Sequence, residues 1–97
     1  MIPYSFHPEA EAEFAEAALF YESRLVGLGK LFASEVDETI SLIRKYPDVG
    51  SPVGYLRRRM LVRGFPYSVV YRRDPDFILI IAVAHSGRRP RYWRHRK

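Results

Sequence analysis

Apolar residues recur at steps of three and four along two stretches of the first half of the chain, which is the period of an amphipathic helix. The first stretch follows Pro8, whose fixed φ suits a first helical position, and it is rich in glutamate. Its apolar positions are Ala10, Phe14, Ala17, Ala18, Tyr21 and Leu25. The second stretch runs to Tyr46, where Pro47 cannot continue a helix, and its apolar positions are Leu28, Leu31, Phe32, Val36, Ile40 and Ile43. Because only a short segment with Gly27 and Gly29 joins the two, the pattern predicts an antiparallel helical hairpin.

The second half of the chain has the composition of strands and turns. Residues 48–54 are rich in Asp, Gly, Ser and Pro, which predicts a loop. Three strand-like runs follow, separated by turn residues: Arg57–Arg63, Tyr67–Arg73 and Phe77–Ala84. These runs predict an antiparallel meander, with the third strand central and buried on both faces. With a short strand at Ile2–Phe6, the prediction is an α+β fold of order β-α-α-β-β-β, its helical hairpin packed on one face of a small twisted antiparallel sheet.

Composition narrows the class of protein. A chain of 97 residues predicts a single domain, 1–97, of marginal stability that a binding partner would raise. Cysteine is absent, so no disulfide is expected, and no run has the length of a signal peptide or membrane span. We therefore expect a cytoplasmic protein. The tail from Arg88 to Lys97, interrupted by Pro90, is expected to be well ordered only at its start.

Charge is divided unequally along the chain, whose formal net charge is +5. Up to Gly50, four basic residues stand against nine acidic ones, whereas beyond it twelve basic residues stand against two, so the two parts carry −5 and +10. A concentrated positive field attracts phosphate-bearing molecules. The second half of the chain is therefore predicted to bind a polyanion.

Arginines on the first strand of the predicted meander are candidates for that binding. By period two, Arg59, Leu61 and Arg63 share one face, while Met60 and Val62 share the other, which the helices would cover. Arg59 and Arg63 would then project from the open face, where two guanidinium forks could hold a phosphate. Charged residues on a strand can equally serve only to prevent aggregation between sheets, and that interpretation stays open.

His85 and two aromatic residues complete the candidate chemistry. His85 directly follows the third strand of the meander, beside Arg63 and Arg88 in our prediction, where positive charge would favour a neutral imidazole able to act as acid or base. It could alternatively cap the strand. Tyr92 and Trp93 could stack on bases, although core packing is the preferred interpretation for Trp93. No phosphate loop, metal-ligand spacing or Ser-His-Asp pattern is present, so neither a cofactor nor a metal is expected.

Several segments resemble the RelE/ParE superfamily, the toxins of bacterial type II toxin-antitoxin (plasmid stabilisation) systems. They are Phe65–Tyr71 and Ile81–Trp93, together with Ala17–Glu22, Gly27–Gly29 and Phe32. The resemblance covers nearly the whole chain and implies a helical hairpin on an antiparallel sheet. It also implies a cognate antitoxin, which we expect to be an acidic, partly disordered chain that folds on binding.

The resemblance leaves the activity open, because the superfamily contains ribosome-dependent mRNA endoribonucleases similar to RelE and DNA gyrase poisons similar to ParE. For the nuclease, which is our first hypothesis, the matching catalytic residues would be Arg63 on the phosphate, His85 as acid or base, and Tyr92 as proton donor. Arg57, Arg58, Arg59, Arg88, Arg89 and Arg91 would bind the nucleic acid or other target. Against it, arginines replace the lysine-rich strand of some RelE members, and residues 48–55 offer only Asp48 as a carboxylate. The second hypothesis is a gyrase poison without catalytic activity, and the third is a member with little toxicity.

Overall fold

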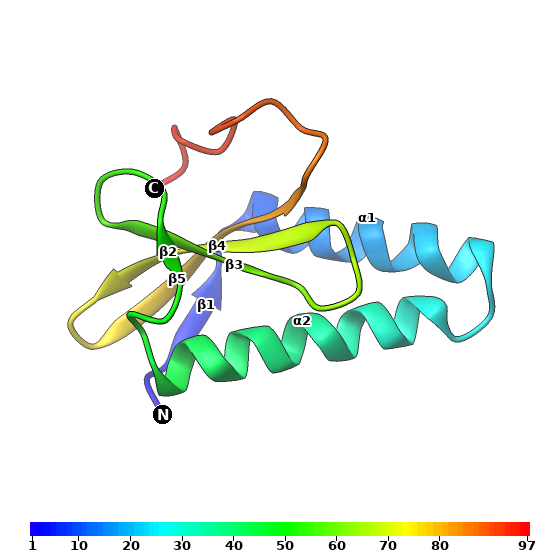
Figure 1. The fold of residues 1–97 in the computed structure, drawn as a ribbon, viewed down its shortest axis with the longest axis horizontal. Helices are drawn as coiled ribbons and strands as arrows, with labels where there is room; N and C mark the ends of the chain where they lie inside the picture. The colour runs from blue at the N-terminus through cyan, green and yellow to red at the C-terminus, as the bar shows by residue number, and fades with distance from the viewer.

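The computed structural model describes residues 1–97 and confirms the predicted fold class and, apart from one additional short strand, the predicted order of elements. A short strand, β1 (Tyr4–Phe6), precedes two helices, α1 (Pro8–Arg24) and α2 (Leu28–Lys45). Four strands follow: β2 (Ser51–Pro52), β3 (Arg57–Leu61), β4 (Tyr67–Asp74) and β5 (Phe77–His85). The strands form one sheet in the order β1-β5-β4-β3-β2, and the helical hairpin runs beside it (Figure 1). Neither helix is long and apolar enough to cross a membrane.

Local interactions fix the start of α1 and the turn into α2. His7 caps α1 by accepting the backbone N–H of Glu9 at its Nδ1, and Pro8 occupies the first turn. Gly27 precedes α2 with a φ of 91°, a conformation that favours glycine. Gly29 lies so close to the carbonyl of Ala18 that a Cβ would clash, so a residue without a side chain lets the two helices meet.

The sheet differs from the prediction in two details. The meander β3-β4-β5 is antiparallel as predicted, but β1 pairs parallel with β5, Tyr4 opposite Ile78, so the sheet is mixed. In addition, Ser51 and Pro52, predicted to lie in a loop, form the edge strand β2 opposite Arg59 and Arg58. Two residues are too few to produce an alternating pattern, and proline is tolerated only at such an edge.

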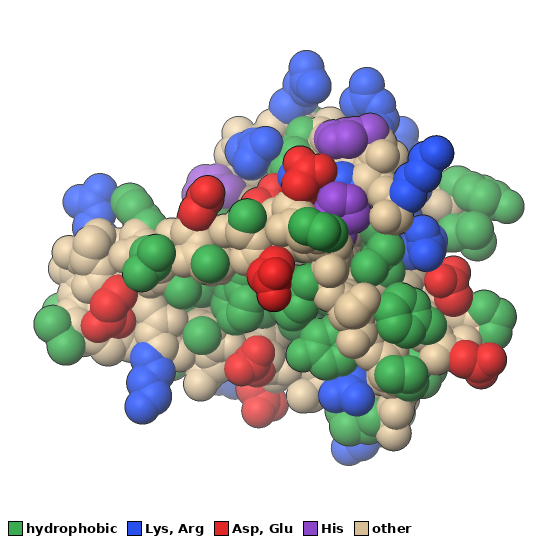
Figure 2. Space-filling model, turned by 180° about the vertical axis from the view of Figure 1, so that it is seen from behind, with side chains coloured by type: hydrophobic (Ala, Val, Ile, Leu, Met, Phe, Trp, Pro, Cys, Tyr) green, Lys and Arg blue, Asp and Glu red, His purple; other side chains and the backbone are tan.

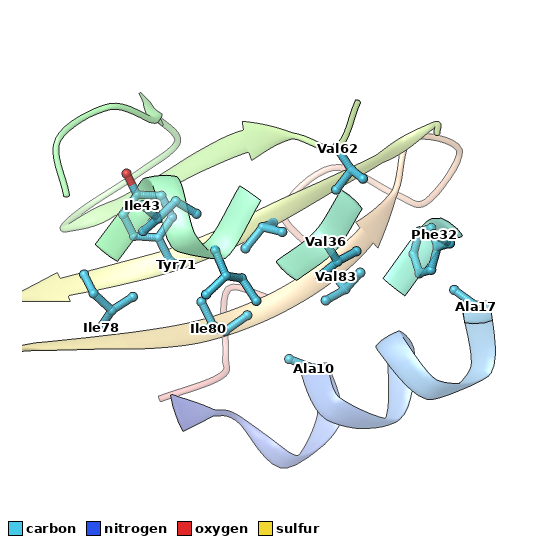
Figure 3. Packing of buried hydrophobic residues seen from close by; sticks show 12 residues of the cluster. Ala10, Ala17, Phe32, Val36, Ile43, Val62, Tyr71, Ile78, Ile80 and Val83 are labelled. Atoms are coloured by element: carbon cyan, nitrogen blue, oxygen red, sulfur yellow. The ribbon is translucent and has the colours of Figure 1, made fainter. Parts of the chain in front are cut away.

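The main core lies between the hairpin and one face of the sheet (Figure 3). Phe32, Val36 and Ile43 from α2 contact a layer formed by Tyr71, Ile78, Ile80 and Val83 of β4 and β5, while α1 contributes Ala10 and Ala17. Leu25 and Leu31, predicted on the buried helix faces, are instead more than half exposed. Both lie near the hairpin tip, where Leu25 already follows the end of α1 in extended backbone.

A second, smaller core covers the opposite face of the sheet and corrects the prediction of a largely disordered tail. Trp93, only 6% exposed, packs on Val70, Ile81 and Ala82, as preferred from the sequence. Arg96, three residues further on, is only 5% exposed. Figure 1 shows the tail, in orange and red, running from the end of β5 back over the sheet toward β2. The tail is ordered because the Trp93 indole and a buried ion pair of Arg96 attach it to the rest of the molecule. Its strongly basic composition gave no indication of these contacts.

Candidate functional site

A groove of about 530 Å³ lies between the tail and the sheet face that carries the smaller core. Its floor comes from β3, β4 and β5, one wall from β2 and the following loop, and the other from the tail. We call it the arginine groove; its lining residues are Pro52, Val53, Gly54, Arg59, Leu61, Ser68, Val70, Ala84, His85, Ser86, Arg88, Arg89, Pro90, Arg91, Tyr92 and Trp93. It therefore joins residues from the strands and the chain end that are up to 41 positions apart.

The arginine groove is strongly cationic. Four arginines line it and no carboxylate does. Arg59, Arg89 and Arg91 form no ion pair, whereas Arg88 stacks 3.8 Å from the centre of the Tyr92 ring and lies 3.9 Å from the Glu13 carboxylate. In Figure 2, basic and histidine side chains gather along the top of the molecule, where the tail lies, with acidic side chains spread below them. Guanidinium groups free of internal partners can bind phosphate or carboxylate groups of another molecule.

His85 lies at the end of β5 with one ring nitrogen already engaged. Its Nδ1 accepts the backbone N–H of Gly87 at 2.8 Å, and its ring meets the edge of Tyr67 at 5.1 Å between centroids. A nitrogen that accepts a hydrogen bond carries no proton, so the neutral imidazole has its proton on Nε2. In this arrangement His85 can donate a hydrogen bond to an anion, but it has no free lone pair with which to act as a base.

Tyr92 is half-buried, and its proton is also engaged. The hydroxyl donates to Oε2 of Glu13 at 2.7 Å. Burial raises the pKa of Tyr92 well above its ordinary value of 10.0, and the hydrogen bond to Glu13 and the charge of that carboxylate raise it further. The phenol is therefore a structural donor that retains its proton.

Three of the predicted site residues lie outside the arginine groove. Arg63 follows the end of β3 and lines a separate hollow beside α2, together with Glu35 and Lys45, so it does not join Arg59 as predicted. The strand ends at Leu61, and the alternation that paired the two arginines ends with it. Arg57 donates to the carbonyl of Arg96 at 2.7 Å and faces the Trp93 ring.

Arg58 serves the other side of the sheet. It donates to the carbonyl of Gly50 at 2.7 Å and lies 3.8 Å from the Asp48 carboxylate. The structure thus brings together Arg59, Arg88, Arg89, Arg91, His85 and Tyr92, and it separates Arg63 and Arg58 from them.

The sequence analysis did not single out Glu13 and Arg96, which hold the tail against the rest of the molecule. Their side chains form two parallel hydrogen bonds of 2.9 and 3.0 Å, although the residues are 83 positions apart. In the sequence Glu13 is one of several glutamates on a helix, and Arg96 is one of several cations near the chain end. No spacing or motif distinguishes either residue from its solvent-exposed neighbours.

The chain is a small basic α+β protein, with a helical hairpin on one face of a mixed sheet and a cationic groove on the other. Comparison with known proteins identifies its family. A sequence profile described as the ParE toxin of the type II toxin-antitoxin system parDE matches residues 4–90. The chain belongs to this ParE toxin family, within the RelE/ParE superfamily.

The fold agrees with this assignment. A solved structure, the chromosomal ParDE toxin-antitoxin system from P. aeruginosa, superimposes with a TM-score of 0.73 at 16% sequence identity, covering 88% of this chain and 96% of that chain. A search of curated proteins found no match.

Proposed function

We propose that this ParE-family toxin arrests growth by binding DNA gyrase through the arginine groove, without cleaving RNA. The observation that carries the proposal is a groove with unpaired guanidinium groups and no carboxylate or imidazole lone pair free to act as a general base. Such a groove is suited to holding an acidic or phosphate-bearing surface.

The ribosome-dependent nuclease, favoured by our first hypothesis, is less well supported. Cleavage through the 2′-OH needs a base to activate that hydroxyl and an acid to protonate the leaving oxygen. The Nδ1 lone pair of His85 already accepts a hydrogen bond from Gly87, and the Tyr92 hydroxyl already donates its proton in a hydrogen bond to Glu13. Arginine is too firmly protonated to act as a base, and Arg63 lies outside the groove.

Two assays on the purified chain separate the candidates. In a supercoiling assay with DNA gyrase, we expect the wild type to inhibit and Arg59→Ala/Arg89→Ala to lose inhibition, while His85→Ala, which removes one neutral donor and no charge, weakens inhibition much less. In a primer-extension assay on ribosome-bound mRNA, we expect intact message. Codon-positioned cuts that disappear in His85→Ala would show that the nuclease hypothesis holds and that the gyrase proposal is wrong.

We further propose that an acidic antitoxin neutralises the toxin by covering the arginine groove. The matching family is defined as one half of a toxin-antitoxin pair, and carboxylates of a partner would supply the counter-charges that Arg59, Arg89 and Arg91 lack. An acidic reading frame is expected next to the gene of this chain, and its co-expression should yield a complex with a higher Tm. A complex in which all three arginines remain open to chemical modification would contradict this placement.

A further inference from the structure

We infer that Glu13 is the positioning residue of the arginine groove: from α1, its carboxylate fixes the tail that carries Arg88, Arg89 and Arg91. The inference deepens the proposed function and rests on it only in taking the groove as the binding site. Glu13 does not line the groove, so its action is through the tail.

The tail is attached at the edge of β5, where the sheet lacks a strand. The last pair of β1 and β5 is Phe6 with Ile80, followed by a hydrogen bond from His7 N–H to the Ile80 carbonyl. Further along β5, the Val83 N–H donates to Oε1 of Glu13 at 3.0 Å, and the Ile81 carbonyl accepts from Nη1 of Arg96 at 3.1 Å. The Glu13 and Arg96 side chains therefore replace the missing strand, satisfying backbone groups that would otherwise be unpaired.

Every other strong contact of the Glu13 carboxylate is with the tail. It accepts hydrogen bonds from both terminal nitrogens of Arg96 and from the Tyr92 hydroxyl. Arg88 lies 3.9 Å from it, a long distance for an ion pair. The carboxylate is only 15% exposed and the Arg96 side chain 5%. A bidentate pair at this depth defines distance and direction together. Removing the Glu13 carboxylate leaves the buried Arg96 guanidinium only the half-exposed Glu9 carboxylate, 3.7 Å away, as a counter-charge.

The tail positioned in this way forms one wall of the groove. Tyr92 and Arg96 are fastened on either side of Trp93, whose indole packs on the sheet. The segment 88–91 lies between the end of β5 and this fastened stretch, so both of its ends are held. Three of the four groove arginines belong to that segment, whereas Arg59 comes from β3. Without the Glu13 carboxylate, Arg59 would keep its place and the other three would lose theirs.

Trp93 is the only tryptophan, so its emission, excited at a wavelength that the seven tyrosines do not absorb, reports docking of the tail. The test compares the full chain with Glu13→Gln, Arg96→Gln, the double variant and the control Glu16→Gln, which alters an exposed glutamate of α1 that has no polar contact. We expect red-shifted emission and increased acrylamide quenching in both single variants, and no change in the control. On the Arg96→Gln background, Glu13→Gln should add little, because both substitutions release the same tail.

Unchanged Trp93 emission in Glu13→Gln, or additive effects of the two substitutions, would overturn the inference. If Glu13→Gln loses its helical circular dichroism, Arg96→Gln carries the test, because it removes the ion pair from the tail and leaves α1 and the Glu13 bond to Val83 unaltered. Gyrase inhibition, measured on the same proteins, tests the proposed function and not the positioning role of Glu13. A wild type that does not inhibit gyrase refutes the proposed function, whereas a tail that stays docked in Glu13→Gln refutes the positioning role.

Discussion

Tyr71 joins the core to the loop that follows α2. Its ring is fully buried, and its hydroxyl donates to the Pro47 carbonyl at 2.7 Å while accepting the Gly50 N–H at 3.0 Å. A Cβ at Gly50 would lie only 2.8 Å from that hydroxyl, so glycine is required for this approach. One phenol thereby sets the position of residues 47–50, from which β2 continues.

Removing the Tyr71 hydroxyl should destabilise the fold with little change in packing. Tyr71→Phe leaves the Gly50 N–H buried without an acceptor, which costs about 1–3 kcal/mol of unfolding free energy. Urea denaturation followed by circular dichroism measures the loss. The control is Tyr55→Phe, at a tyrosine that is 83% exposed. Equal stability of Tyr71→Phe and the control would show that the two hydrogen bonds are not stabilising.

Tyr92 predicts a loss of stability in alkali. Its folded pKa is raised above 10.0 by burial and by Glu13, so the unfolded chain gives up the proton at a lower pH than the folded chain. The stabilisation is fully present below pH 10 and is lost as the pH rises toward the folded pKa. We expect Tm to fall above about pH 10 and Tyr92→Phe to fall less steeply over the same interval. Parallel curves for the two proteins would contradict this origin of the alkaline loss.

At the scale of elements, a single carboxylate joins the two helices. Glu22, near the end of α1, accepts the N–H groups of Gly27 at 2.9 Å and Gly29 at 3.0 Å. These donors belong to the start of α2, where the partial positive charge of the helix also favours an anion. The hydrogen bond from Gly27 lowers the pKa of Glu22 below its ordinary 4.5, and those from Gly29 and Lys30 lower it further, while desolvation acts in the opposite direction.

This lowered pKa predicts stabilisation that acid removes. Because the folded pKa lies below the unfolded one, the contribution of Glu22 is present above pH 4.5 and is lost as the pH falls through the folded pKa. Glu22→Gln should therefore lower Tm at neutral pH, and its difference from the wild type should narrow below about pH 4.5. Thermal melts across this range provide the measurement, with Glu16→Gln as the control. A difference that does not depend on pH would show that the charge of Glu22 is not responsible.

An irregularity in β5 explains how one strand serves two cores. Val70 pairs with Ala82 and Tyr71 with Ile80, so Ile81 has no partner and forms a bulge. Before the bulge Ile78 and Ile80 face the helices, and after it Val83 does, while Ile81 and Ala82 both contact Trp93. The apolar run 77–84 predicted a strand buried on both faces, which is confirmed. Its uniform composition could not reveal the bulge, because every position is apolar on either face.

At the scale of the whole molecule, the unequal charge of the two halves becomes a difference between two faces. The acidic half forms the hairpin, and the basic half forms the sheet and the tail that crosses it (Figures 1 and 2). Some cations are neutralised internally, as Arg96 is by Glu13 and Arg72 by Asp74. Arg59, Arg89 and Arg91 of the groove have no such partner, so the uncompensated charge is concentrated there.

Position, rather than net charge, should therefore govern binding. Two triple variants test this, and each lowers the formal charge from +5 to +2. The groove variant is Arg59→Ala/Arg89→Ala/Arg91→Ala, whose residues line the groove. The helix variant is Arg24→Ala/Lys30→Ala/Lys45→Ala, whose residues lie on α1 and α2. With a fluorescent DNA duplex as a polyanion probe, the slope of log affinity against log salt should fall by about 3 in the groove variant, or about 1 per arginine. The helix variant should change little and should still arrest growth. Equal losses in both variants would indicate an unspecific effect of net charge.

The amino-acid sequence was sufficient to predict the helical hairpin, the antiparallel meander, the burial of β5 and the preference of Trp93 for the core. These features follow from local periodicity, turn residues and side-chain type, each of which can be recognised within a stretch of a few residues. It also indicated the basic sheet face and, through its resemblance, the superfamily.

The parallel pairing of β1, the short strand β2, the course of the tail and the composition of the groove became visible only in the folded molecule. These features depend on contacts such as that between Glu13 and Arg96, which lie far apart along the chain and carry no local pattern. Whether a particular arginine is bound internally or free for a partner depends on which carboxylate the fold brings within reach of it. Arg96 and Arg89 therefore have different roles in the folded protein, although their side chains are chemically identical.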